Sequence, residues 1–543
     1  MTFPIVAIRV AVALTALSIA LPTYAQAQTA VSASSSSALP NLGDATDMTP
    51  NVERRLGDRI ASELYRDPDY VDDAVLVEYV QGIWQPLLAA ARVRGELQPE
   101  LDEAYAWEIL LGRDRSVNAF ALPGAYFGLH LGLVGIVTSR DELASVLAHE
   151  LSHVTQRHIS RMMTRQSQQA PWMLGAMLLG VLAASKSPDA GTAMIMGGQA
   201  AGAQSQLNFS RDMEREADRV GFTIATQAGF AQQGFVSMFG KLQQSSRLND
   251  SGNFPYLRSH PLSTERMADM QSRIDLPDAA AAPAAGPGAR KNVQETDHAM
   301  MSARARVLSN YTVDALRTWA VEVDAANLAK ASPAQQAASL YGATLAAIKL
   351  RDYKEAQTQW TRLSNSVRND PVAARLARLL GVELKLAEGD SAAALTLLQS
   401  GAKPDKAPSR AELFFAAQAN LQLSAAAPVA TPAATVPGTR PANGLSATTQ
   451  QLQTWVAGHP RDAQAWQLLS STYAAEGRTL SSIRAQAEVN VAQLDYPAAL
   501  SRFKTAQEWA RKGGAGTDHF EASIVDTRTR QVESTVREQA LER

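Results

Sequence analysis

The residues with the clearest chemical meaning in this chain of 543 residues form the segment His149-Glu150-Leu-Ser-His153. On an α-helix the two histidines stand four residues apart, so both imidazoles project from one face and can bind one zinc ion. Glu150 lies about 100° further round such a helix. That direction suits a general base acting on a water that zinc activates, and it does not suit a third ligand. The segment therefore predicts a catalytic zinc centre; two solvated histidines on a surface helix are the alternative.

A catalytic zinc ion needs three protein ligands and one open position. Acidic candidates lie in residues 208–221, which read as a helix. Glu214 and Asp218 are four residues apart and share a face, whereas Glu216 points about 200° away from Glu214. If Glu214 binds zinc, Asp218 can accept a hydrogen bond from the far nitrogen of a liganding histidine and fix its ring. The residues alone leave Glu216 open as the alternative ligand, and a charged helix face as the alternative to a metal site.

The elements that must position these residues are mostly helical. Helical periodicity runs through residues 52–65, 71–91 and 142–163, and candidate strands cover 104–111 and 120–133. This pattern predicts a predominantly α-helical α+β fold with a small sheet. An extended segment that starts at Asn118, Ala119 and Phe120 would place an edge strand beside the metal. Such an edge can pair with an extended substrate through main-chain hydrogen bonds, and a buried core strand is the alternative.

A chain of this length should hold two or three domains. Beyond a predicted linker at residues 277–295, small and aromatic residues recur as in tetratricopeptide helix pairs. An ordinary helical bundle is the alternative. The predicted organisation is a signal peptide (1–25), a disordered lead-in (26–50), a metallopeptidase domain (51–276), a linker (277–295) and a helical repeat domain (296–543) with a low-complexity insertion near 425–444.

Composition excludes several classes of protein. A net charge of -2 with a pI near 6.5 gives no electrostatic basis for a nucleic-acid partner. The absence of cysteine excludes disulfides and thiolate zinc sites. The apolar segments 172–184 and 193–203 are each too short to span a bilayer. They could form a lid, a surface that contacts lipid or unfolded strands, or a packed hairpin.

Three motifs together resemble the M48 family of zinc metallopeptidases. They are His149-Glu150-x-x-His153, Ser210-Arg211-x-x-Glu214-x-x-Ala217-Asp218 and Asn118-Ala-Phe-Ala-Leu-Pro-Gly124. The resemblance implies a zincin-like domain with one zinc ion per chain, and it implies Glu214 as the third ligand. Ser259-His260-Pro261 also resembles a family motif, which implies that His260 can act as a reversible fourth ligand and hold the enzyme latent. Arg266 would order this loop or stabilise the oxyanion.

Residues 143–158, followed by helical hairpins, resemble in particular the periplasmic members of this family that act in the assembly of outer-membrane β-barrels. This resemblance implies a zinc endopeptidase of the periplasm, soluble or peripherally associated with the membrane. Its expected partners are unfolded or misassembled outer-membrane proteins, with the β-barrel assembly machinery bound through the repeat domain. The alternative is a chaperone or assembly factor whose zinc site is latent or structural. Nothing in the sequence marks the free-amine site that an aminopeptidase requires.

Overall fold

The computed structural model describes residues 48–165, 211–248, 255–275, 296–323, 328–401, 407–426, 444–512 and 518–541. These residues belong to one compact unit, Thr46–Arg543. The predicted signal peptide, most of the lead-in, the apolar segments 172–203, the linker and most of the low-complexity insertion lie outside the described residues. The predicted division into two domains stays a prediction. No helix among the described residues is long and apolar enough to cross a membrane.

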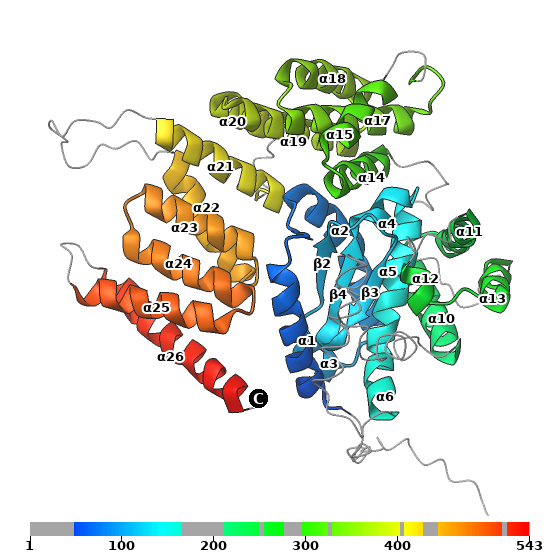
Figure 1. The fold of residues 1–543 in the computed structure, drawn as a ribbon, viewed down its shortest axis with the longest axis horizontal. Coiled ribbons are helices and arrows are strands. Elements are labelled where there is room, and N and C mark those ends of the chain that lie inside the picture. Colours follow the sequence, from blue (N-terminus) through cyan, green and yellow to red (C-terminus); the bar gives the residue numbers. More distant parts are fainter. Residues whose placement is uncertain are drawn as a thin grey trace, which may run out of the picture. The chain divides into compact units, whose positions relative to one another are not determined.

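A small mixed sheet lies at the centre of the first part of the chain (Figure 1). The strand order is β1-β2-β4-β3, in which β2 and β4 are parallel and β3 pairs antiparallel to β4. Phe120 of β3 lies opposite Gly128 of β4. The strands are β1 (Tyr70–Val71), β2 (Glu108–Gly112), β3 (Ala119–Leu122) and β4 (Tyr126–His130).

The two faces of the sheet bury different side chains, because successive residues of a strand point to opposite faces. Ile109 and Phe127 belong to the main hydrophobic core, together with side chains of α2 and α5. Leu110 and Tyr126 instead pack with Leu56 and other residues of α1. The helices of this part are α1 (Pro50–Arg66), α2 (Ala74–Val93), α3 (Pro99–Ala104), α4 (Leu131–Ile136), α5 (Arg140–Thr155), α6 (His158–Arg165), α10 (Arg211–Gln227), α11 (Gln233–Leu248), α12 (Pro255–Ser259) and α13 (Thr264–Asp275).

The predicted α+β, predominantly helical fold is confirmed, with some differences in the elements. The periodicity of residues 142–163 predicted one helix, but the chain leaves α5 after Thr155 and begins α6 at His158. Arg157 adopts a positive φ of 54° at this break, and its guanidinium donates to the carbonyl oxygen of Met48. The expected strand 120–133 is divided into β3, a turn, β4 and the start of α4.

From Thr296 onward the described chain is helical, and consecutive helices pack against one another (Figure 1). Indole rings fill the space above two helical glycines: a Cβ on Gly342 would lie 2.3 Å from the Trp319 ring, and one on Gly381 would lie 2.5 Å from the Trp360 ring. The helices are α14 (Thr296–Ser309), α15 (Val313–Glu322), α17 (Pro333–Leu350), α18 (Tyr353–Ser366), α19 (Pro371–Glu388), α20 (Ser391–Gln399), α21 (Arg410–Ala426), α22 (Gly444–Gly458), α23 (Ala463–Ala475), α24 (Thr479–Ala492), α25 (Tyr496–Arg511) and α26 (His519–Leu541).

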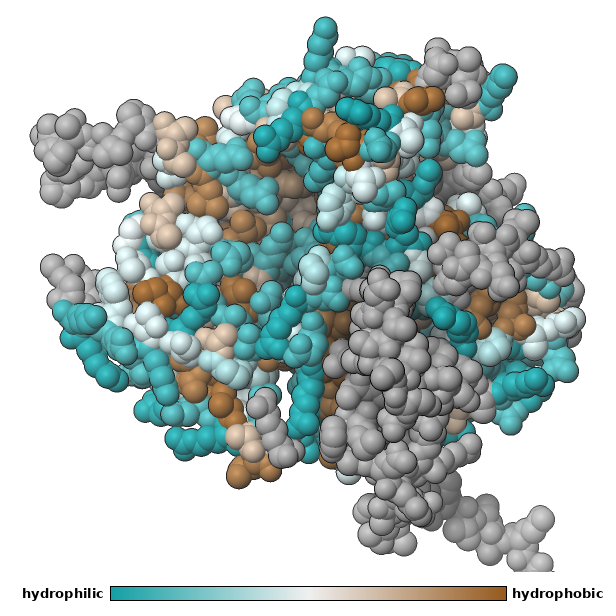
Figure 2. Space-filling view, viewed as in Figure 1, coloured by the Kyte–Doolittle hydropathy of each residue, from teal (hydrophilic) through white to brown (hydrophobic). Residues whose placement is uncertain are grey.

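The surface mixes hydrophilic and hydrophobic residues. Figure 2 shows hydrophobic residues in small groups among hydrophilic ones on the face in view. Large apolar side chains that are strongly exposed include Val93 at the end of α2, and Phe520 and Leu541 near opposite ends of α26. Single exposed apolar residues of this kind are ordinary in folded proteins.

Candidate metal centre

Helix α5 carries the H-E-x-x-H segment through the interior of the molecule. Ser139 caps its first turn by accepting a hydrogen bond from the N–H of Glu142, and every residue from Glu142 to Thr155 is buried. His149, Glu150 and His153 are at most 2% exposed. Two solvated histidines on a surface helix are therefore excluded as an interpretation of this segment.

Helix α10 packs directly on α5, and Gly221 permits the close approach. A Cβ on Gly221 would lie 3.0 Å from the backbone of Ala148 and His149. Asp218 lies one helix turn before Gly221, and Glu214 lies two turns before it. Both side chains are buried and face the histidines. Glu216 projects elsewhere, toward His158 and Arg161, and lies outside this cluster.

Four side chains bring their ligand atoms to one point. These atoms of His149, His153, Glu214 and His260 lie within 4.8 Å of one another. The Nε2 atoms of the first two histidines are 3.0 Å apart, and Nδ1 of His260 lies 3.4 Å from His149 Nε2 and 3.0 Å from Glu214 Oε1. Ligand atoms at 2.0–2.1 Å from a tetrahedral zinc ion stand roughly 3.3–3.4 Å apart. The observed separations and the nitrogen and oxygen donors fit one zinc ion per chain.

The charges around this point favour a cation. Burial lowers the pKa of His149, but hydrogen bonds to Asp218 and Glu214 outweigh it and raise this pKa to about 10. Burial would raise the pKa of Glu214, yet His260, His149 and His153 hold it well below its usual value. The acidic side chains thus stabilise positive charge at His149, whereas burial and the neighbouring His149 hold the pKa of His153 well below its usual value and keep that ring neutral.

Glu150 lies beside the ligand atoms without joining them. Its Oε1 is 3.5 Å from Nε2 of His260, and neither carboxylate oxygen has a partner that meets hydrogen-bond geometry among the described residues. Burial raises the pKa of Glu150. A buried carboxylate with a raised pKa is suited to take up a proton.

Asp218 and Arg266 support the ligands from behind. Asp218 Oδ1 is 2.9 Å from Nδ1 of His149. The guanidinium of Arg266 donates to both oxygens of Asp218 at 2.6 and 2.8 Å, and its Nη1 lies 2.8 Å from Glu214 Oε2 and donates to the Pro261 carbonyl oxygen at 2.7 Å. All three guanidinium nitrogens of Arg266 are therefore engaged in holding the acidic side chains and the loop after His260.

His260 follows α12, and this short helix adds contacts that the sequence did not reveal. The ring of Tyr256 stacks on that of His260, with centroids 4.7 Å apart and an interplanar angle of 29°. The N–H of Tyr256 donates to the carbonyl oxygen of Val117 at 3.3 Å, just before β3. The segment that carries His260 is thus held both at the cluster and at the start of the edge strand.

The residues expected to form a substrate edge lie at β3. Ala119 and Phe120 belong to β3, which is the last strand of the sheet among the described residues and packs against α5. Asn118 is buried and its carbonyl oxygen accepts a hydrogen bond from the N–H of His130. The Phe120 ring covers Gly128, where an added Cβ would approach it to 2.1 Å.

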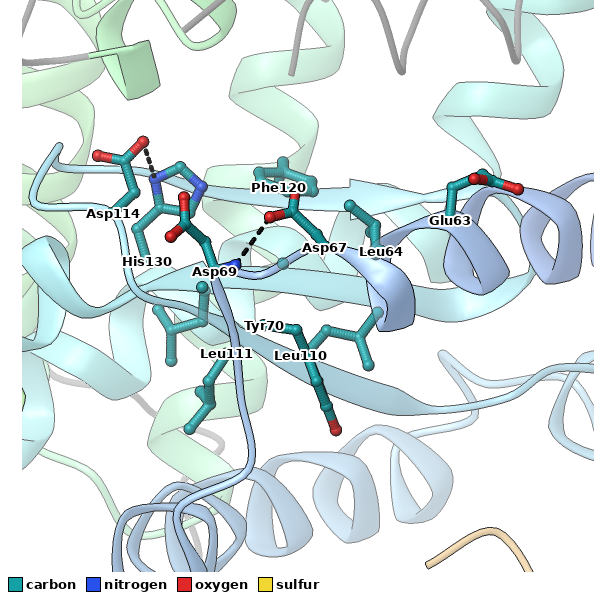
Figure 3. A pocket seen from close by; sticks show the side chains of 13 residues that line it. Glu63, Leu64, Asp67, Asp69, Tyr70, Leu110, Leu111, Asp114, Phe120 and His130 are labelled. Atoms are coloured by element: carbon teal, nitrogen blue, oxygen red, sulfur yellow. Dashed lines mark hydrogen bonds and ion pairs between the residues drawn. The ribbon is translucent and has the colours of Figure 1, made fainter. Parts of the chain in front are cut away.

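A separate cavity of about 290 Å³ opens near the end of α1 (Figure 3). Figure 3 shows the carboxylates of Asp67, Asp69 and Asp114 near the imidazole of His130, above apolar side chains. None of the four ligand residues lines this cavity. Its lining is Glu63, Leu64, Asp67, Asp69, Tyr70, Leu110, Leu111, Gly112, Asp114, Phe120, Gly128, Leu129 and His130.

A buried H-E-x-x-H helix that faces a glutamate on a second helix is the donor arrangement of a zinc metallopeptidase. Comparison with known proteins agrees, because residues 81–274 match Peptidase family M48. This part of the chain is therefore similar to the members of peptidase family M48.

Several of the similar proteins are β-barrel assembly-enhancing proteases. The chain is 31% identical over 331 residues to a putative β-barrel assembly-enhancing protease of Vibrio cholerae, covering 60% of this chain and 63% of that protein. It is 30% identical over 334 residues to the β-barrel assembly-enhancing protease of Escherichia coli, covering 60% and 62%. The corresponding Yersinia pestis protein is 26% identical over 482 residues, covering 88% and 89%. The matches to the first two thus span less than two thirds of those proteins, and the chain is a homologue of this group.

Proposed function

We propose that this chain is a zinc-dependent endopeptidase in which His149, His153 and Glu214 hold the metal and Glu150 is the general base. The observation that carries this proposal is the convergence of three ligand atoms from α5 and α10 beside the buried carboxylate of Glu150. The match of residues 81–274 to peptidase family M48 supports it independently.

Zinc, when bound, would supply a Lewis acid that polarises the scissile carbonyl and acidifies a water molecule. Glu150 accepts the proton of the attacking water and returns it to the leaving amine, a role for which its raised pKa is suited. Asp218 keeps the far nitrogen of His149 occupied, so that Nε2 is directed at the ligand cluster. Arg266 holds Asp218 and Glu214 in place.

The proposed substrates are unfolded or misassembled outer-membrane β-barrel proteins, and the proposed compartment is the periplasm. The names of the relatives from three bacteria support the substrate class, and the export signal expected in residues 1–25 supports the compartment. β3 would pair with an extended substrate, and the helices from α14 onward would bind substrate or the β-barrel assembly machinery. Peripheral contact with the membrane belongs to the same proposal.

Cleavage of unfolded casein by the zinc-loaded full chain tests the proposal. Glu150→Gln should keep one zinc per chain and the wild-type fold, and it should lower cleavage at least about 100-fold, because the proton acceptor is lost. The substitution is made in both the wild-type and the His260→Ala backgrounds, so that a latent site does not hide the effect. Cleavage by Glu150→Gln at the rate of its parent would refute the assigned base.

One observation favours a second candidate function. Four protein ligand atoms, including that of His260, converge here, and a zinc ion with four protein ligands is usually structural. The chain could then act chiefly as a chaperone or assembly factor. His260→Ala separates the two functions: cleavage that appears or rises in this variant supports a latent peptidase, whereas two inactive proteins with zinc bound support the chaperone.

A further inference from the structure

The imidazole of His158 is completely buried next to the metal cluster and has no part in the mechanism above. Its Nδ1 lies 2.9 Å from Nδ1 of His153, and its Nε2 lies 2.9 Å from Oε2 of Glu216. Arg161 Nη1 donates to the same oxygen of Glu216 at 2.9 Å. A chain of polar contacts therefore runs from the back of a proposed zinc ligand to a carboxylate at the surface.

The break between α5 and α6 creates this contact. On an uninterrupted helix, a residue five positions after His153 would lie about 7.5 Å further along the axis and about 140° round it. The positive φ of Arg157 turns the chain instead, so that the ring of His158 meets that of His153 at a centroid distance of 5.0 Å. The backbone at Arg157 is thus shaped in a way that brings the two rings together.

Metal binding fixes the direction of the hydrogen bonds. If Nε2 of His153 gives its lone pair to zinc, its Nδ1 carries the proton and donates. Nδ1 of His158 must then accept, so Nε2 of His158 carries a proton and donates to Glu216. Donors and acceptors therefore alternate without conflict from His153 through His158 to Glu216.

We propose that His158 is a positioning residue for His153, and that Glu216 orients His158 in turn. This inference rests on the proposed function, because it assigns His153 as a zinc ligand. It gives the two histidine ligands unequal supports: Asp218 holds His149 directly, whereas an imidazole mediates between His153 and its carboxylate. The carboxylate of Glu216 is 38% exposed, so this second support reaches solvent, while that of Asp218 is 1% exposed.

The dissociation constant for zinc tests this assignment. It is measured by adding zinc to the metal-free full chain in competition with a fluorescent chelator. His158→Phe keeps a ring without an acceptor and should weaken zinc binding about 10- to 100-fold, the usual effect of losing such a support. His158→Asn places an amide oxygen near the position of Nδ1 and should recover most of the affinity. Glu216→Ala, at a partly exposed position that does not disturb the core, should weaken binding by a smaller factor.

His298→Phe is the matched control, because His298 is also buried and hydrogen-bonded, to Tyr79 and to the Val137 carbonyl oxygen, but lies outside the cluster. It should leave the zinc constant unchanged. Equal losses in His158→Phe and His158→Asn would reduce His158 to a packing role, and wild-type affinity in both His158→Phe and Glu216→Ala would overturn the assignment. A wild-type chain that binds no zinc would instead overturn the proposed function itself.

Discussion

At the scale of single residues, Arg266 balances the charges behind the metal centre. Its guanidinium is 5% exposed and lies between the carboxylates of Asp218 and Glu214, over the ring of Phe239. Its contacts hold the pKa of Asp218 below its usual value in spite of burial, which acts in the opposite direction. Removal of this cation would leave the buried carboxylate of Asp218 without its main partner and would take one ion-pair partner from Glu214.

Arg266→Met should therefore lower the free energy of unfolding by roughly 3–5 kcal/mol, the usual cost of breaking one side of a buried ion pair. Urea unfolding of the metal-free protein measures this. Arg273→Met is the control, because Arg273 pairs with Asp269 in a more exposed position on the same helix, α13, where such pairs contribute about 0–1 kcal/mol. Equal losses of unfolding free energy in the two variants would show that the buried ion pairs of Arg266 contribute no more to stability than the more exposed pair of Arg273.

At the scale of elements, the spacing between α5 and α10 decides whether a metal site exists. Glu214 comes from α10 and both of the proposed histidine ligands come from α5, so the two helices must approach at a fixed distance for the proposed site to form. Gly221 contacts the backbone of Ala148 and His149, and a methyl group there would press on main-chain atoms that cannot move without the whole helix.

Gly221→Ala should separate the two helices, lower the free energy of unfolding by about 1–3 kcal/mol and weaken zinc binding. The measurements are urea unfolding and chelator competition. Gly240→Ala on α11 is a matched control: its added Cβ would meet no atom within 4 Å, so it should gain up to about 1 kcal/mol from helix propensity and leave zinc binding unchanged. A Gly221→Ala variant that is more stable than the wild type and binds zinc with unchanged affinity would contradict the fixed spacing of α5 and α10.

At the scale of the whole molecule, two aspartates just before α2 connect the sheet region to the later helices. Asp73 forms an ion pair with buried Arg304 of α14, and Asp72 forms one with Arg410 of α21. Burial raises the pKa of Asp72 to about 6; Arg410 lowers it in part, and Asp462 raises it further. These pairs make the stability of the compact unit dependent on pH.

The sign of this dependence follows from the raised pKa. The unfolded chain loses the Asp72 proton near pH 4 and the folded protein near pH 6, so the contribution of Asp72 is most favourable below pH 4 and is lost as pH rises to about 6. Relative to Asp72→Asn, the wild type should lose about 2–3 kcal/mol of stability between pH 4 and pH 7. Denaturant unfolding across this range measures the difference, with Asp314→Asn at an exposed position as control. A constant difference would contradict the raised pKa.

Sequence reasoning predicted the fold class, and it predicted that His149 and His153 lie on one face of a helix, because helix geometry fixes the relation between residues four positions apart. It left Glu214 and Glu216 as alternatives, since a helix considered alone does not show which face meets its neighbour. The packing of α10 on α5 turns Glu214 toward the histidines and Glu216 away from them, which supports the proposed choice of Glu214. It assigned no role at the metal to His158, because periodicity carried one helix through Gln156 and Arg157. The stacking of Tyr256 on His260 depends on the loop between two elements and leaves no periodic signal.

The indole rings that cover Gly342 and Gly381 imply an order of events in evolution. A side chain at position 381 would overlap Trp360, whose indole also donates to the Ala377 carbonyl oxygen at 2.8 Å. A lineage can therefore replace the tryptophan first and fill the glycine afterwards, whereas the reverse order passes through an intermediate in which the indole ring must shift to make room for the new side chain. Homologues that have a larger residue at position 381 should accordingly lack a tryptophan at position 360, and the same exclusion should hold between positions 342 and 319.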